Sequence, residues 1–157
     1  MKITLLAVGK TDNKNLEQLI SLYSKRLQHY VSFSFEMVPD VKKVKKFSQT
    51  QQKEAEGRAL LKKIEPSSCL VLLDEKGTGF SSLQFSAFLQ KKMNSGLRHL
   101  TFCIGGPYGF SEEICTRSDH NVSLSKMTFS HQMVRLFFTE QLYRGFTILN
   151  NQPYHHG

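Results

Sequence analysis

The last residues of this chain carry side chains suited to acid–base chemistry. Pro153, Tyr154, His155 and His156 stand near the end of its 157 residues, where most chains fray into unstructured polar residues. An imidazole exchanges protons near neutral pH, and a phenol stacks on a base or donates a hydrogen bond. Two adjacent histidines without further ligands make a poor metal site, so we predict proton transfer and no bound metal. The tail is therefore a candidate wall of an active site.

A second candidate binding element is the loop Gly105-Gly-Pro-Tyr-Gly109, which stands between a predicted strand and a predicted helix. Open α/β sheets bind ligands at such positions. The loop lacks the spacing of the two common phosphate-binding motifs. The next helix opens with Glu112 and Glu113, which repel an anion from the positive helix N-terminus. We therefore predict a neutral or cationic ligand, and a glycine-rich turn without any ligand is the alternative.

Strand-like and helix-like segments alternate along the whole chain and would position these residues. The predicted strands cover residues 2–8, 32–38, 69–74, 100–104 and 121–125, with a glycine-rich turn at 75–79. Helices are predicted over residues 131–149 and after the N-cap candidates Asp12 or Asn13, Ser48, Ser81 or Ser82, and Ser111. This alternation predicts one α/β domain with a mainly parallel sheet and helices on both faces.

Hydrophobic periodicity predicts which side chains face the core. One face of the first predicted helix carries Leu16, Leu19, Ile20, Tyr23 and Leu27. One side of the strand at 32–38 carries Phe33, Phe35 and Met37. We expect these two sets to lie against the sheet or its covering helices.

The predicted helix at 131–149 is apolar on more than one face. Its apolar residues are Met133, Val134, Leu136, Phe137, Phe138, Leu142, Phe146, Ile148 and Leu149. A surface helix of a small monomer shows only one apolar stripe, so the excess predicts a two-fold homodimer. Gly145 is unusual inside such a helix and predicts close approach of another backbone or helix. Glu140 and Arg144 are four residues apart and are placed to pair.

Charge and composition restrict the partners. The 21 Lys and Arg residues against 13 Asp and Glu give a net charge of +8, which favours a polyanion such as nucleic acid; a merely soluble basic protein is the alternative. The basic stretch at 42–46 either contacts phosphate or is simply solvated. No apolar run reaches the roughly 20 residues that span a bilayer, and no signal peptide is recognisable, which predicts a cytoplasmic protein without membrane contact. Cys69, Cys103 and Cys115 show no metal-ligand spacing and, being odd in number, no disulfide framework.

Several segments in one order give the chain a family resemblance. They are Lys2–Lys10, Ile104–Gly109, Ser123–Thr128 followed by His131, Glu140–Arg144, and Pro153–His155. With these residues the chain resembles, from end to end, the ribosomal RNA large-subunit methyltransferase H family, whose members are small SPOUT methyltransferases. The four motifs that follow the opening stretch, taken together in this order, make the resemblance specific.

The resemblance implies a SPOUT-type fold and an activity. It implies a single SPOUT domain over residues 1–157, with a Rossmann-like half at 1–68 and a cofactor-binding half at 69–157 that contains a deep C-terminal trefoil knot. It also implies a homodimer that uses S-adenosylmethionine to methylate N3 of a pseudouridine in 23S ribosomal RNA, on the assembled ribosome. The general rule that connections do not thread loops would have predicted an unknotted sheet, so the knot comes from the resemblance alone.

The resemblance further implies the site residues. The cofactor-binding positions are Leu73, Gly105, Leu124, Ser125, Lys126, Met127, Thr128 and Phe129. Their types suit the ligand, because aliphatic side chains form a slot for adenine and a glycine lets the backbone approach closely. The catalytic positions are Arg144, Tyr154 and His155. His155 would act as the base or orient it, Tyr154 would contact the nucleoside, and Arg144 would hold a phosphate or the tail.

Three features depart from the pattern of that family. Ser130 replaces a proline, Gly145 replaces an alanine, and the tail ends His-His-Gly instead of with Arg or Lys. They keep open a second hypothesis, a ribosome-associated RNA-binding protein that has lost catalysis. A third hypothesis, a nucleotide-binding α/β enzyme of another class, is disfavoured by the missing phosphate motifs. Measuring methyl transfer separates the first hypothesis from the second.

Overall fold

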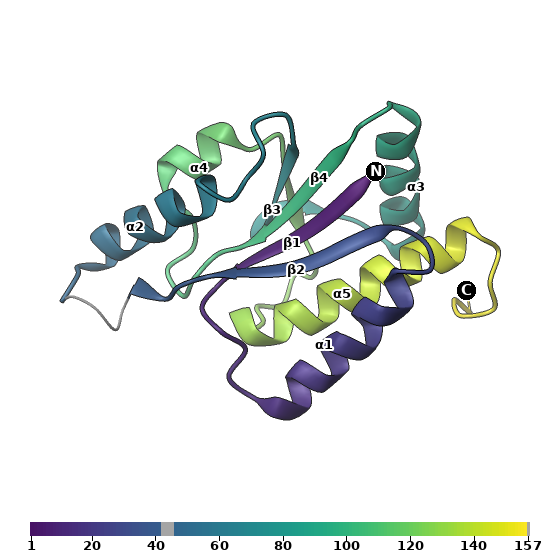
Figure 1. The fold of residues 1–157 in the computed structure, drawn as a ribbon, viewed down its shortest axis with the longest axis horizontal. Coiled ribbons are helices and arrows are strands. Elements are labelled where there is room, and N and C mark those ends of the chain that lie inside the picture. The colour runs from purple at the N-terminus through teal and green to yellow at the C-terminus, as the bar shows by residue number, and fades with distance from the viewer. Residues whose placement is uncertain (42–45, 157) are drawn as a thin grey trace.

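A parallel sheet forms the centre of the protein, and helices cover both of its faces (Figure 1). The computed structural model describes residues 1–41 and 46–156, so most of the basic stretch at 42–46 lies outside the described residues. Within them the sheet has five parallel strands in the order β2-β1-β4-β3-β5, which confirms the predicted α/β class. In chain order the elements are β1 (Lys2–Val8), α1 (Lys14–Leu27), β2 (Ser32–Val38), α2 (Gln49–Leu61), β3 (Cys69–Gly79), α3 (Ser82–Asn94), β4 (His99–Ile104), α4 (Glu112–Arg117), β5 (His120–Ser123) and α5 (His131–Leu149).

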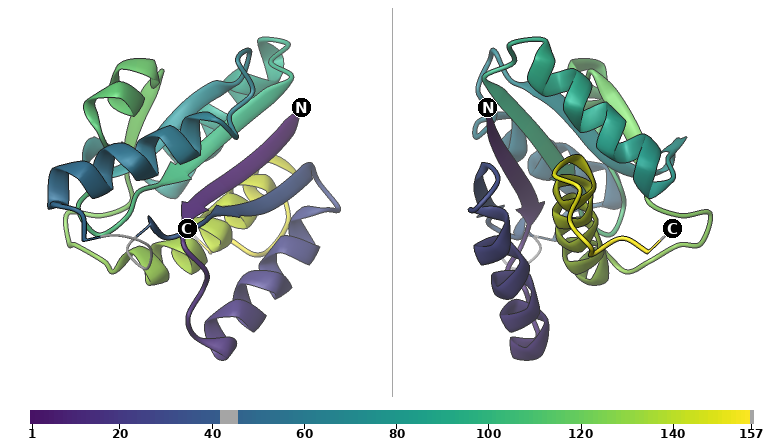
Figure 2. Two further views of the ribbon diagram at one scale, coloured as in Figure 1. Left: turned by 60° about the vertical axis from the view of Figure 1, so that its left-hand side comes forward. Right: turned by 90° about the vertical axis from the view of Figure 1, so that its right-hand side faces the viewer.

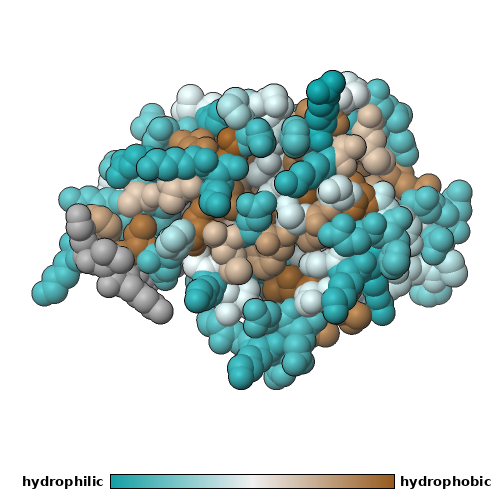
Figure 3. All heavy atoms as spheres, viewed as in Figure 1, coloured by the Kyte–Doolittle hydropathy of each residue, from teal (hydrophilic) through white to brown (hydrophobic). Residues whose placement is uncertain are grey.

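Helices bury both faces of the sheet. Successive residues of a strand point to opposite faces, so each strand contributes side chains to both buried layers. In β1, Ile3, Leu5 and Ala7 pack under α1, α3 and α5, whereas Leu6 and Val8 pack against α2 and α4. Such a strand reads as a continuous apolar run, as predicted for residues 2–8. Figure 2 shows the helices on the two sides of the sheet from other directions. Figure 3, in the view of Figure 1, shows hydrophilic residues over much of the outer surface of the helices.

Polar side chains begin most helices as the sequence predicts. Asn13 caps α1 by accepting hydrogen bonds from two backbone N–H groups of the first turn. Ser48 and Ser81 each form a capping box with a glutamine three residues later. A cap of this kind stabilises a helix by about 1 kcal/mol. Ser111 stands at the N-cap position of α4, but its buried hydroxyl makes no capping hydrogen bond, so that part of the prediction is wrong.

Two side chains predicted to face the core are exposed. Leu19 on α1 is 44% exposed and Met37 on β2 is 41% exposed, although Leu16, Ile20 and Leu27 are buried as expected. The reason is the position of these elements. β2 is an edge strand, and α1 contacts only β2 and α5 extensively, so neighbours cover only part of each surface.

β3 is longer than the sequence predicts. Residues 75–79, predicted as a turn, continue the strand to Gly79 after a change of register between Leu73 and Thr78. Gly77 permits this pairing, because a Cβ at that position would lie 2.6 Å from the backbone nitrogen of Val122 on β5. The glycines that suggested a turn therefore serve an irregular strand pairing, a known second role of glycine in strands.

The close approach predicted at Gly145 is confirmed. α5 contacts both α1 and α3, and a Cβ on Gly145 would lie 2.9 Å from Cδ1 of Leu89 on α3. The ring of Phe85, also on α3, would lie 3.7 Å away. Glycine thus lets α5 settle onto α3 more closely than another residue would, at a cost in helix propensity of roughly 0.5–1 kcal/mol.

The two predicted halves of the chain share one sheet. β1 and β2 belong to residues 1–68 and the other strands to 69–157, and β1 pairs directly with β4 across that division. The division into halves and the trefoil knot concern the path of the chain rather than strand pairing, and both stay predictions. None of the helices in the described part of the chain is long and apolar enough to cross a membrane.

Candidate cofactor pocket and C-terminal cluster

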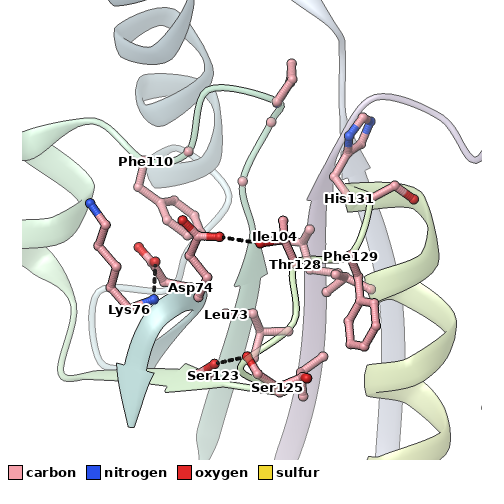
Figure 4. A pocket seen from close by; sticks show the side chains of 18 of the residues that line it. Leu73, Asp74, Lys76, Ile104, Phe110, Ser123, Ser125, Thr128, Phe129 and His131 are labelled. Carbon is pink, nitrogen blue, oxygen red and sulfur yellow. Dashed lines mark hydrogen bonds between the residues drawn. The ribbon is translucent and has the colours of Figure 1, made fainter. Parts of the chain in front are cut away.

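A cavity of about 630 Å³ opens where three neighbouring strands end or change register (Figure 4). Its walls come mainly from residues 73–76 of β3, the loop 104–110 after β4, and most of the segment 122–131 after β5. Ligand sites of parallel sheets lie beyond the carboxyl ends of the strands, and this volume is typical of a pocket for one small molecule. The glycine-rich loop therefore lines a cavity and is not merely a tight turn between two elements.

Most residues predicted to hold the cofactor meet at this cavity. Those that line it are Leu73, Gly105, Leu124, Ser125, Met127, Thr128 and Phe129. Lys126 belongs to the same segment, but its side chain is exposed and does not line the cavity. The structure thus brings together seven of the eight predicted positions from three separate segments of the chain.

The floor of the cavity is apolar and tightly built. Leu73, Ile104 and Val122, from three adjacent strands, are buried at its base. A Cβ on Gly105 would lie 3.3 Å from the carbonyl group of Gly109 and from the Phe110 ring. A larger residue at position 105 would therefore crowd its own loop, so glycine keeps the backbone open toward the cavity.

Short hydrogen bonds shape the segment after β5. The Ser123 hydroxyl donates to the carbonyl oxygen of Ser125 at 2.9 Å, and the Ser125 hydroxyl accepts from the backbone N–H of Met127 at 2.9 Å. The Thr128 hydroxyl donates to Oε2 of Glu75 across the cavity at 3.0 Å (Figure 4). The segment is therefore tied both to itself and to the extension of β3.

α5 begins at the edge of the cavity. Ser130, at a position where the resembled family has proline, caps α5 by accepting from the backbone N–H of Met133 at 3.2 Å. Gln132 then joins this helix start to the loop after β1, because its side chain donates to the carbonyl oxygen of Lys10 and accepts from the backbone N–H of Asp12. The serine therefore supplies a regular helix start in place of the proline.

Arg135 is a structural residue that the sequence analysis missed. Its side chain is fully buried, and its guanidinium donates to the carbonyl oxygens of Val8 at 2.6 Å and Gly9 at 3.0 Å, and to the Thr11 hydroxyl at 3.1 Å. Burial lowers the pKa of the guanidinium, whereas Asp12 opposes that shift. These bonds fasten α5 to the end of β1 one turn after the cavity. A single arginine within the apolar run of the helix was the available signal.

A buried carboxylate behind the glycine-rich loop was also missed. Glu56 on α2 is 2% exposed, and its Oε1 accepts from the Gln52 side chain at 2.7 Å. A Cβ on Gly106 would collide with the other carboxylate oxygen. The second glycine of the loop therefore leaves room for a polar side chain of the helix behind it. Polar residue types in a helix are ordinarily assigned to solvent, so the sequence offered no signal for this burial.

The three predicted catalytic residues meet along the C-terminal half of α5, around Glu140. The Arg144 guanidinium forms an ion pair with Oε1 of Glu140 at 2.7 Å, as the spacing predicted. The Tyr154 hydroxyl donates to the same oxygen at 3.0 Å, and Arg144 stacks 4.7 Å from the centre of the Tyr154 ring. Nη1 of Arg144 lies 3.4 Å from Nδ1 of His155. We call these four residues the C-terminal cluster.

The hydrogen bonds of the C-terminal cluster assign donors and acceptors within it. Burial, followed by the hydrogen bonds with Tyr23 and Glu140, raises the pKa of Tyr154, so its phenol keeps its proton and acts as a donor. A guanidinium can only donate, so Nδ1 of His155 is the acceptor in this contact. The contact with Arg144 therefore occupies one of the two ring nitrogens of His155.

The C-terminal cluster and the cavity lie along different parts of α5. Val134 is the last residue of α5 that lines the cavity, and Arg144 of the cluster follows ten residues later, about 15 Å along the helix at a rise of about 1.5 Å per residue. No described residue after Val134 lines the cavity. Within a single chain, the tail is not the wall of this pocket that its residue types suggested.

An exposed apolar surface adjoins the cavity on the outer side of α5. Met127 is 74% exposed, and Phe129, Met133 and Phe137 are also exposed, with the two phenylalanine rings 4.8 Å apart. We call these four residues the apolar patch. Among the described residues, no group of three or more His, Cys, Asp or Glu side chains is arranged to hold a metal ion.

Comparisons with known proteins agree on one family. Residues 1–155 match the family model described as Predicted SPOUT methyltransferase. The protein named Ribosomal RNA large subunit methyltransferase H from Christiangramia forsetii is 62% identical over 156 residues, which cover 99% of each chain. Proteins of the same name from Flavobacterium psychrophilum and Porphyromonas gingivalis are 62% and 58% identical, again over 99% of each chain.

Proposed function

The chain belongs to the SPOUT methyltransferase family, and from this premise we propose that it uses S-adenosylmethionine to methylate N3 of a pseudouridine in 23S ribosomal RNA. One observation carries the proposal: seven of the eight residues that the resemblance assigns to the cofactor line one cavity. The names of the relatives support ribosomal RNA as the substrate. The proposal includes a cytoplasmic reaction on the assembled ribosome.

The cavity suits S-adenosylmethionine, which would supply a methyl group carried on a positively charged sulfur. Leu73, Leu124 and Met127 offer apolar surfaces for the adenine ring. Gly105 allows the backbone to approach the ligand, and a side chain there would crowd its own loop. The ligand has no phosphate, in agreement with the two glutamates at the start of α4. Holding the methyl donor beside the target base would account for much of the rate enhancement.

A basic chain is suited to an RNA substrate. The net charge of +8 attracts a polyanion, because neutralising phosphates releases counterions. Lys53 and Lys76 line the cavity, where they would meet the backbone of RNA entering the pocket. Methyl transfer should accordingly weaken as the salt concentration rises.

We propose that the active unit is a homodimer in which the tail of one copy completes the pocket of the other. None of the four residues of the C-terminal cluster lines the cavity of its own chain, and Arg144 stands about 15 Å along α5 from Val134, the last cavity residue of the helix. The apolar patch lies between the two sites and offers a surface for a second copy, whose α5 would run in the opposite direction. A two-fold axis across α5 would then bring each tail toward the cavity of the partner.

In this assembly each residue of the C-terminal cluster has a role. Glu140 orients Arg144 and Tyr154 by accepting from both. Tyr154 remains protonated and would donate a hydrogen bond to the nucleoside. His155 would take the proton from N3 through Nδ1, which requires that the contact with Arg144 opens when RNA binds. Arg144 would then be available for a phosphate.

Methyl transfer from labelled S-adenosylmethionine to ribosomes tests the proposal. The ribosomes should come from a strain without this gene, and ribosomes from the parent strain, whose site is already methylated, are the substrate control. We expect incorporation at a pseudouridine of 23S RNA, mapped by mass spectrometry. His155→Ala should lower the rate at neutral pH on the order of 10²-fold or more, whereas His29→Ala, in the exposed turn after α1, should not.

The alternative is an RNA-binding protein without catalysis, favoured by the His-His-Gly tail that lacks the usual basic ending. It predicts binding to ribosomes with no incorporation from the wild-type protein. Full activity of His155→Ala would instead leave the reaction standing and remove His155 from the role of base.

A further inference from the structure

Two carboxylates border the cavity without an ionic partner. Asp74 and Glu75 both line it, and neither takes part in an ion pair within residues 1–41 and 46–156. Asp74 is engaged in its own turn, because its Oδ1 accepts from the backbone N–H of Lys76 at 2.9 Å. Lys53 and Lys76 line the same cavity, so the position of each charge, rather than the net charge of the lining, decides which ligand the pocket favours.

Glu75 is held against the segment that lines the cavity. Its Oε2 accepts the 3.0 Å hydrogen bond from Thr128, and its Oε1 makes no hydrogen bond with any described residue. Lys53 and Lys76 line the same cavity, but no hydrogen bond holds their ammonium groups in the described part of the chain. Glu75 is therefore a charge in a defined position, with one oxygen available to a ligand.

We propose that Glu75 makes the pocket prefer a positively charged ligand and so favours the methyl donor over the demethylated product. This inference rests on the proposed function, in which the donor carries a sulfonium and the product, S-adenosylhomocysteine, a neutral thioether. The two ligands otherwise share every polar group, so a fixed charge is a means of telling them apart. The preference lets the spent product leave a pocket that its donor enters readily.

The expected effect is moderate because Glu75 is exposed to solvent. Two unit charges a few ångströms apart in water attract with an energy that corresponds to a change in affinity on the order of five- to tenfold. Added salt screens such a pair, so the preference should shrink at high ionic strength.

Binding measurements separate this charge effect from a purely structural role. Isothermal titration calorimetry would give dissociation constants for S-adenosylmethionine, S-adenosylhomocysteine and sinefungin, an analogue with a charged amine near the place of the sulfonium. The variants are Glu75→Gln, which removes the charge and keeps the shape, and Thr128→Val, which removes the hydrogen bond and keeps the charge. Glu113→Gln, on the exposed side of α4 and outside the cavity, is the matched control.

We expect Glu75→Gln to weaken S-adenosylmethionine and sinefungin by about five- to tenfold and to leave S-adenosylhomocysteine nearly unchanged. Thr128→Val should weaken all three ligands alike, and Glu113→Gln should change none. Equal losses for charged and neutral ligands in Glu75→Gln, or no losses, would overturn the inference while leaving the proposed function intact. Failure of the wild-type protein to bind any of the three ligands would instead refute the proposed function, and the inference with it.

Discussion

Replacing Arg135 with methionine should destabilise the protein and weaken its pocket together. The buried guanidinium donates to two backbone carbonyls, of Val8 and Gly9, and to the hydroxyl of Thr11. Methionine fills a similar volume but cannot donate, so the acceptors at the end of β1 lose these bonds. Because α5 borders the cavity one turn earlier, the loss should reach the ligand site as well.

The size of the effect follows from these contacts. A buried carbonyl left without its hydrogen bond costs about 1–3 kcal/mol, and two such carbonyls are affected. Part of this is recovered, because methionine carries no charge to desolvate, and desolvation is the main cause that lowers the pKa of Arg135. We expect a net loss of about 2–4 kcal/mol in the free energy of unfolding. In a chain of this size that corresponds to a melting temperature lower by roughly 10 °C.

Urea unfolding monitored by circular dichroism would measure this loss. Arg58→Met, on the exposed side of α2, is the matched control and should stay within about 0.5 kcal/mol of the wild type. Arg135→Lys should fall between, because an ammonium carries the charge but not the planar fork of donors. A loss below about 1 kcal/mol for Arg135→Met would refute the reasoning, since the carbonyls would then be satisfied without the guanidinium. Calorimetry of the folded variant should show weaker binding of S-adenosylmethionine.

Three other substitutions test the packing of β3 against β5, the formation of the dimer and the dependence of stability on pH. Gly77→Ala places a Cβ against the backbone of β5 and should cost about 1–3 kcal/mol in urea unfolding, whereas Gly79→Ala, with open space around it, should cost less; equal costs would contradict the close pairing. Phe137→Asp should turn the proposed dimer into a monomer by light scattering, and Leu22→Asp, equally exposed on α1, should not. Burial raises the pKa of the Cys103 thiol to about 12. The unfolded chain therefore loses this proton at lower pH than the folded protein, so stability falls as pH rises from about 8.5 toward 12. Cys103→Ala should make that fall in melting temperature shallower, and an unchanged slope would show that other groups cause it.

Local signals predicted the elements well, because each depends on a few neighbouring residues. The apolar run at 2–8, the cap at Asn13 and the capping box at Ser48 all concern groups within one turn or one strand. The wrong assignments concern groups whose environment is set elsewhere in the chain. Leu19 is exposed because α1 lies at the margin of its layer, and the turn predicted at 75–79 is a strand because β5 pairs with it.

Some residues of the candidate site were likewise identified from the sequence, and others were missed. The resemblance identified the positions round the cavity, and the structure adds that Lys126 points elsewhere and that Glu75 reaches Thr128. Arg135 and Glu56 were missed because a charged residue in a helix is ordinarily assigned to solvent. Their burial depends on carbonyl groups and glycines that lie far away in the sequence.

The sequence by itself determined the class of fold, the family and the types of residue that could bind a methyl donor and move a proton. Periodicity, caps and ordered motifs are properties of neighbouring residues, so they can be recognised without coordinates. Only the tertiary structure decided which of these residues meet. It joined three strand ends into one cavity and placed His155 with Arg144 and Glu140 beside the C-terminal half of α5, away from that cavity. That separation follows from the rise of a rigid helix, which no residue type reveals until the helix is packed in the fold.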